Sequence, residues 1–172
     1  MDYFSEQCHG DTWYVFSLID DCVKLIQQRE NHDGITKETI TARRLVLHIV
    51  QSFEKYVSPT AEEGTELHDF PFKYGLRDEL PVDQLPTISE IAAYVDEIKE
   101  LCLDYLKPFN DERLQDNDPL KSMETNYFRI QHAIFHAAVH LGHIDQLLYD
   151  PSDPKGWECF AYVYPESSPV LR

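Results

Sequence analysis

Four segments of the chain repeat apolar residues at intervals of three or four, which is the period of a helix that turns one face toward a core. The segments are residues 12–30, 39–57, 87–107 and 122–149. The third has the clearest start, because Glu90 follows Thr87 by three residues, as in a capping box. No segment shows a convincing alternation of apolar and polar residues. The pattern therefore predicts an all-α fold, a four-helix bundle.

The expected helix ends follow from capping and breaking residues. Asp11 is expected to cap the first helix, and the sequence NHDG is expected to end it. The connection between the second and third helices covers residues 58–86, whereas about 2–8 residues typically join antiparallel helices. A span of this length suits a crossover that joins two parallel helices. Four of its side chains either cap a pocket or only pack on the bundle: His68, Phe70, Phe72 and Tyr74.

Length and composition suit one core, because 42% of the 172 residues are hydrophobic. We expect a single domain over residues 1–172, with the bundle at about 12–149. Residues 150–172 form a tail rich in proline and aromatic residues. We expect this tail to wrap around the bundle, although its sequence CFAYVYP is also compatible with a short strand.

The chain is strongly acidic, with a net charge of −16 from 31 Asp and Glu against 15 Lys and Arg. This charge opposes binding to nucleic acid or to an anionic membrane, so neither is an expected partner. No apolar run approaches the roughly 18 residues of a membrane span, and the N-terminal sequence is not typical of a signal peptide. We therefore expect a cytoplasmic protein. Its four cysteines form no CxxC pair, and Cys22 and Cys102 are expected to face the core.

The last helical segment contains His132, His136, His140 and His143. On a helix they fall within an arc of about 80°, because each residue turns ~100°. His140 then lies nearest the apolar face, His136 lies next, and the other two lie toward the rim. Two histidines four residues apart can direct ring nitrogens at one ion, which indicates a metal site. The alternative is a set of solvated or hydrogen-bonded histidines.

A third ligand has to come from another helix, and His48 is the one histidine within the second helical segment. It lies in the sequence ARRLVLHIVQSF, at the margin of the apolar face. His9, His32 and His68 lie in terminal or loop segments, where a surface role is expected. The motifs HExxH and GxSxG and a P-loop are absent, so nothing indicates a zincin, an α/β-hydrolase or a nucleotide-binding enzyme.

The sequences LVLHIVQSF and HAAVHLGHIDQLL, together with the long crossover, resemble the DinB/YfiT-like superfamily of metal-binding four-helix bundles. That superfamily shares its name with an unrelated DNA polymerase. The resemblance covers about residues 12–149. It implies that His48, His136 and His140 hold a divalent transition-metal ion, with zinc or nickel as the first choice and iron or manganese as alternatives.

Two further histidines leave the register of the ligand pair open. His143 stands where the family usually has Gln, after the glycine of its HxGQ motif. His132 lies one turn before His136, and a pair made of these two would leave His140 against the core. The rotation of the helix and the His-Leu-Gly context both favour His136 with His140.

Three neutral imidazoles leave open positions on an ion, as in catalytic rather than structural sites. The resemblance implies an enzyme that activates a low-molecular-weight thiol or water for a small-molecule substrate, and so resembles a thiol S-transferase or a hydrolase. The alternative is a non-catalytic metal or small-molecule binding protein, such as a sensor. Amphipathic outer helices and the resemblance both predict a homodimer. No catalytic residue is assigned.

The surroundings of the site are less defined by the sequence. Glu54, Asp145 and backbone carbonyls are candidates to hold the second nitrogen of each ligand ring. Arg43, Arg44 and Arg129 lie one turn before a histidine of the site or of its flanking stripe. We expect these arginines to be surface residues, with binding of a substrate carboxylate as the alternative.

Overall fold

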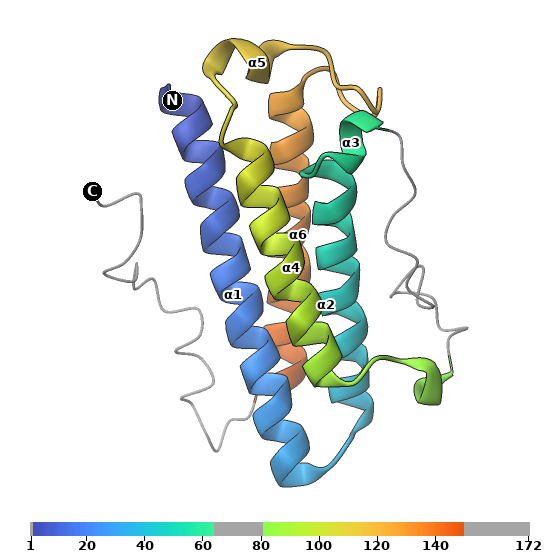
Figure 1. Ribbon diagram of the computed structural model, residues 1–172. Coiled ribbons are helices and arrows are strands. Elements are labelled where there is room, and N and C mark those ends of the chain that lie inside the picture. The colour runs from blue at the N-terminus through green and yellow to red at the C-terminus, as the bar shows by residue number, and fades with distance from the viewer. Residues whose placement is uncertain (1, 64–80, 150–172) are drawn as a thin grey trace.

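The computed structural model describes residues 2–63 and 81–149. Four long helices form a bundle: α1 Tyr3–Asp33, α2 Lys37–Tyr56, α4 Ile88–Leu106 and α6 Asn126–Leu148 (Figure 1). Three short helices lie in the connections: α3 Thr60–Glu63, η1 Val82–Gln84 and α5 Asp111–Gln115. The described residues contain no strand and a single isolated bridge, between Asn117 and Thr125. The predicted all-α four-helix bundle is confirmed.

The long helices are arranged so that α1 and α6 run in one direction and α2 and α4 run in the other (Figure 1). α2 packs against α6 and α4, and α1 packs against α4 and α6. α2 ends and α4 begins at opposite ends of the bundle (Figure 1). This confirms the predicted crossover between parallel helices. Residues 64–80 of the crossover and residues 150–172 of the tail lie outside the described residues, so the expected roles of His68, Phe70, Phe72, Tyr74 and the tail stay predictions.

The first helix begins earlier than predicted, at Tyr3, and Asp11 lies inside it as a half-buried residue rather than as its cap. The start is held instead by α5, because the Ser5 amide donates to the Asp111 carboxylate at 3.0 Å. The Asp2 amide also donates to the Ser5 hydroxyl at 3.0 Å. The distant Asp111 carboxylate thus satisfies a free amide group at this end of the helix in addition to the local capping box of Asp2 and Ser5.

The predicted capping box of α4 is confirmed. The Glu90 amide donates to the Thr87 hydroxyl at 3.3 Å, and the Thr87 amide donates to the Glu90 carboxylate at 2.7 Å. α6 begins at Asn126 rather than near residue 122, with the Thr125 hydroxyl as the acceptor at its N-terminus. The preceding residues form bends because the Asp118 carboxylate accepts hydrogen bonds from the amides of Leu120, Ser122 and Met123.

The apolar faces of the four long helices meet in one core that extends along the bundle. Phe16 of α1 and Phe53 of α2 lie at its centre, fully buried, with ring centroids 4.8 Å apart. Cys22 and Cys102 are buried as predicted, and Cys8 is buried as well. No helix of the described residues combines the length and hydropathy that a membrane span requires.

The expectation that three arginines lie on the surface is wrong. Arg43 and Arg44 are 8% and 9% exposed, and Arg129 is not exposed at all. Arg43 forms an ion pair with Glu30 of α1, and Arg129 forms one with Asp118 at 3.0 Å. A guanidinium can enter a helical core when carboxylates and carbonyls are placed to accept its protons. Sequence periodicity did not indicate these distant partners.

Candidate metal centre

Two neighbouring helices position the candidate ligands. His48 lies in the second half of α2, and His136 and His140 lie one turn apart on α6. α2 and α6 run antiparallel and pack closely along their lengths (Figure 1). His48 lies between the buried residues Leu47 and Ile49, and His136 and His140 are each followed by a buried residue, Ala137 and Leu141. Packing of these apolar neighbours fixes the direction of the rings.

The ring nitrogens of these three residues converge on one point. His48 Nε2 lies 2.9 Å from His136 Nε2, and His140 Nε2 lies 3.1 Å from the same atom. One ligand atom from each of the three residues lies within 4.8 Å of the other two. Two nitrogens bound about 2.1 Å from one ion are about 3.0 Å apart at a right angle and about 3.4 Å apart at the tetrahedral angle. The observed spacings therefore fit three imidazole ligands of a single ion.

Burial keeps the three rings neutral at physiological pH. It lowers the pKa of His48 from 6.5 to about 4, with a further lowering from His136 and His140. The pKa of His136 is lowered by burial and then by His140 and His132, and that of His140 by burial and then by His143. Neutral imidazoles have a free nitrogen lone pair, which is the form that binds a metal ion.

We expect a pH-dependent contribution of His48 to the stability of the metal-free protein. Because its pKa is lower in the folded chain than in the unfolded chain, the unfolded state binds the proton first. Stability contributed by neutral His48 is present above pH 6.5 and is lost as the pH falls toward about 4. Urea unfolding in the presence of chelator measures this loss. The many carboxylates also make the free energy of unfolding depend on pH. Because a His48→Gln variant keeps them, the difference between the two proteins gives the contribution of His48.

In that comparison, the wild type is expected to lose more stability than the variant between pH 7 and pH 5. Equal losses in the two proteins would contradict the lowered pKa of His48.

The second nitrogens of the two α6 ligands are buried, and Nδ1 of His136 and of His140 has no hydrogen-bond partner in the described chain. None of the three candidates, Glu54, Asp145 or a backbone carbonyl of the described chain, therefore holds these two atoms. Glu54 is buried on the side of α2 that faces α4, where it accepts a hydrogen bond from Tyr94. Asp145 follows His136 by nine residues, or about two and a half turns, which places it on the opposite side of the helix.

The two other histidines of the stripe flank the cluster. The ring of His132 stacks on that of His136 at a centroid distance of 6.0 Å, and the ring of Tyr56 contacts His132 at 5.5 Å. His143 is exposed and its ring lies 5.7 Å from that of His140. Both stay outside the converging group, as the rotation of the helix predicted. Tyr56 was not expected here, although it follows His48 by about two turns on a similar face.

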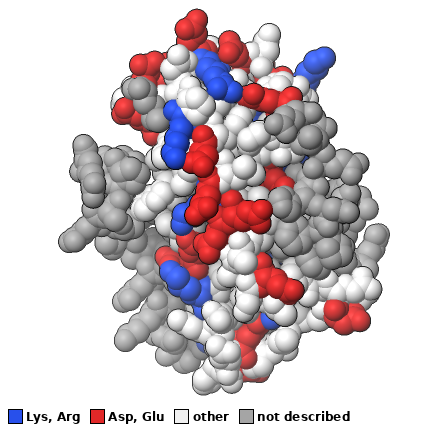
Figure 2. Space-filling model, in the orientation of Figure 1, with Lys and Arg blue, Asp and Glu red and all other residues white. Residues whose placement is uncertain are grey.

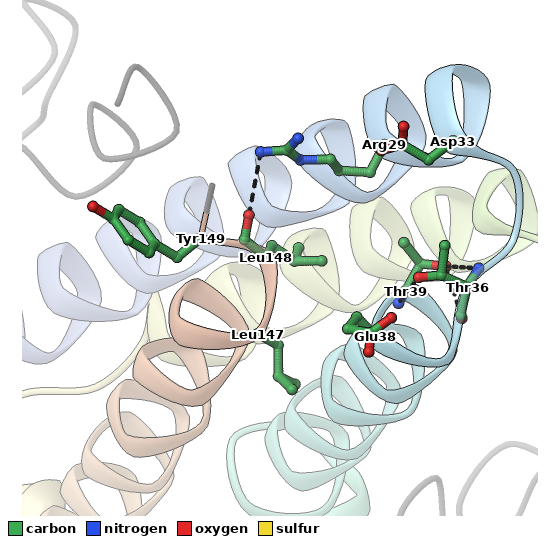
Figure 3. Close-up of a pocket in the computed structure, with 8 residues that line it drawn as sticks. All are labelled: Arg29, Asp33, Thr36, Glu38, Thr39, Leu147, Leu148 and Tyr149. Atoms are coloured by element: carbon green, nitrogen blue, oxygen red, sulfur yellow. Dashed lines mark hydrogen bonds between the residues drawn. The ribbon is translucent and has the colours of Figure 1, made fainter. Parts of the chain in front are cut away.

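A separate pocket of about 280 Å³ lies near one end of the bundle (Figure 3). Its lining comes from the end of α1, the start of α2 and the end of α6, and includes Thr39, Leu147 and Tyr149. Arg29 donates a hydrogen bond to the Leu148 carbonyl at 3.3 Å across one side of it (Figure 3). None of the three converging histidines lines this pocket.

The comparison with protein families agrees with this geometry. A model described as the DinB superfamily matches residues 37–144, which is more than half of the chain and includes all three histidines. The chain belongs to the DinB superfamily. The match runs from the start of α2 to beyond the ligand pair of α6, so the resemblance predicted from the sequence is confirmed. Neither the curated proteins nor the solved structures gave a match.

Proposed function

We propose that this DinB protein is a metal-dependent enzyme in which His48, His136 and His140 hold one divalent transition-metal ion. We further propose that it acts on a small molecule with a low-molecular-weight thiol or water as the nucleophile. The observation that carries the proposal is the convergence of three Nε2 atoms from two helices, with spacings of 2.9 and 3.1 Å around His136.

The donor set suits some metals better than others. Three imidazole nitrogens favour zinc or nickel, with iron or manganese as alternatives, over calcium or magnesium, which prefer oxygen ligands. All three donors are neutral, so the full charge of the ion is retained. When bound, such an ion supplies Lewis acidity that lowers the pKa of a thiol or of water toward neutral pH.

In this proposal the histidines position the ion, and the described cysteines do not take its place in the reaction. His48 fixes one side of the site from α2, while His136 and His140 fix the other from α6. The described cysteines offer no alternative nucleophile. Burial raises the pKa of Cys8 to about 11 and raises that of Cys102 well above its usual range. A buried thiol of this kind stays protonated, so neither Cys8 nor Cys102 suits the role of nucleophile, and we propose an external thiol or water for it.

The proposal is tested by turnover with defined metal content. Electrophilic substrates are screened with glutathione, bacillithiol or mycothiol, and esters and amides are screened without a thiol. We expect activity to disappear with chelator, to return with zinc or nickel, and to be absent in His140→Ala. The His143→Ala variant is the control, because this exposed ring lies outside the converging group.

Two results would count against the enzyme. Turnover that survives complete removal of metal would contradict the mechanism. Tight metal binding without turnover in the whole screen would favour a non-catalytic metal or small-molecule binding protein.

A further inference from the structure

A row of rings leads from the candidate metal centre to the end of α2. The ring of His132 stacks on that of His136 with a centroid distance of 6.0 Å, and the ring of Tyr56 contacts that of His132 at 5.5 Å. Lys55 Nζ lies 5.1 Å from the centroid of the Tyr56 ring. The row crosses from α6 to α2 because the helices are antiparallel, so the residues before His136 lie beside those after His48 (Figure 1). The ammonium group of Lys55 therefore stands at the far end of a row that begins at a candidate ligand.

Lys55 lies on the same face of α2 as His48. A separation of seven residues turns the helix almost two full turns, to within about 20° of the direction of His48, and advances about 10 Å along its axis. The Lys55 side chain is exposed, and within the described residues its ammonium group contacts the Tyr56 ring rather than a carboxylate. This cation–π contact holds the ammonium group beside the row of rings. A lysine in this position can bind an anionic group near the metal centre without being a ligand of the ion.

The parts of α2 and α6 around the metal centre carry little negative charge, although the net charge of the chain is −16. From residue 45 to its end, α2 contains one acidic residue, Glu54, which is buried and bonded to Tyr94 of α4. α6 also contains one, Asp145, on the side opposite His136. Acidic side chains gather instead in a band on the face made by α1 and α4 (Figure 2). Repulsion of an anion is therefore weaker on the side of α2 and α6 than over the acidic band.

We propose that the small molecule bound at the metal centre carries an anionic group that pairs with Lys55. This inference rests on the metal-dependent function proposed above and adds a property of the substrate. An ion held by three neutral imidazoles attracts any nearby anion, but Lys55 adds a selection by length. The anionic group has to lie about 10 Å from the atom that binds the ion. The part of the molecule between these two ends lies along the rings of His132 and Tyr56, which suit apolar or planar groups.

Pairs of thiols that differ in one end group test this proposal on the zinc-loaded protein. Titration calorimetry compares ω-mercaptooctanoate with ω-mercaptooctanol, in which roughly 10 Å separates the sulfur from the end group of the extended chain. It also compares thioglycolate with mercaptoethanol, which are too short to reach Lys55 from the ion. We expect the long carboxylate to bind about 3- to 5-fold more tightly than the long alcohol, as is usual for an ion pair at an exposed side chain.

The Lys55→Gln variant separates the lysine from the charge of the ion. It should bring the affinity ratio of the long pair close to unity and leave the ratio of the short pair unchanged. Lys107→Gln is the matched control, because it makes the same change of charge at an exposed residue that pairs with Asp104 at the end of α4. This control should keep the ratio of the wild type. Both variants should keep the zinc content of the wild type, since neither lysine belongs to the converging group.

Salt gives a second readout. The preference of the wild type for the long carboxylate should decrease as sodium chloride rises from about 20 to about 500 mM, because salt screens an exposed ion pair. A preference that does not change over this range would contradict a role for the exposed Lys55.

The proposal would be overturned if the wild type bound the two long thiols equally, or if it did not bind ω-mercaptooctanoate. An unchanged ratio in Lys55→Gln, or an equal loss of preference in Lys107→Gln, would overturn it as well. The zinc content of the wild type separates this proposal from the proposed function. Any of these results with one zinc ion per chain overturns the pairing with Lys55 alone, whereas a protein that binds no metal overturns both proposals.

Discussion

Replacing Arg129 with Met is expected to lower the free energy of unfolding by about 3–5 kcal/mol. The guanidinium is fully buried and pairs with Asp118 at 3.0 Å. It also donates to the Tyr56 carbonyl, to the Tyr105 hydroxyl at 3.1 Å and to the Asn126 side chain at 2.7 Å. Met fills much of the volume but leaves these acceptors without a donor and Asp118 without its counter-charge.

We expect Asp118 to remain charged when Arg129 is removed. Burial alone raises the pKa of Asp118, but hydrogen bonds from Ser122, Met123 and Leu120 outweigh it and hold that pKa below its usual range. Adding Asp118→Asn to Arg129→Met should therefore recover part of the lost stability, because it removes an uncompensated buried charge.

Urea unfolding of Arg113→Met provides the matched comparison. Arg113 pairs with Glu62 at 2.7 Å, but the two side chains are 33% and 41% exposed. This variant should lose less than about 1 kcal/mol, as is usual for solvent-exposed ion pairs. An equal, small effect for Arg129→Met would contradict the structural role assigned to the buried network.

Replacing His136 with Ala is expected to weaken metal binding by more than about 100-fold, because loss of a residue that only orients a ligand already costs about 10–100-fold. The Nε2 atom of His136 lies within 3.1 Å of the Nε2 atoms of both His48 and His140. The variant therefore loses the nitrogen that lies close to both of the others. Titration calorimetry of the metal-free protein with zinc or nickel measures the effect. The same loss is expected for His48→Ala and His140→Ala.

His132→Ala and His143→Ala are the matched controls, since each removes an imidazole of the same helix face without removing a member of the converging group. Both should retain wild-type stoichiometry. Loss of metal in His132→Ala together with retention in His140→Ala would instead support the other register, in which His132 pairs with His136.

The part of the candidate site on α6 could be predicted from the sequence because its geometry depends on the helical period alone. A spacing of four residues fixes His136 and His140 on one face, whatever the packing of the bundle. His48 was harder to place, since its approach to α6 depends on which helices are neighbours. The resemblance of its surroundings to the family supplied that choice, and the antiparallel packing of α2 on α6 agrees with it.

Features that depend on contacts between distant segments could not be predicted. The start of the first helix at Tyr3 is held in part by Asp111, far along the chain, which accepts a hydrogen bond from the Ser5 amide. Arg129 looked like a surface residue because its acceptors come from three other parts of the chain, the end of α2, the end of α4 and the loop before α6. The sequence also left open which residues hold the second ring nitrogens, and one of the candidates, Glu54, turns toward α4.

X-ray absorption at the metal edge of the zinc-loaded or nickel-loaded protein tests the three-histidine site most directly. The site predicts three imidazole nitrogens at about 2.0–2.1 Å from one ion per chain, with the imidazole count reduced in His140→Ala. A first coordination shell of sulfur or carboxylate oxygen, or the same three imidazoles in the wild type and in His140→Ala, would contradict the assignment of His48, His136 and His140.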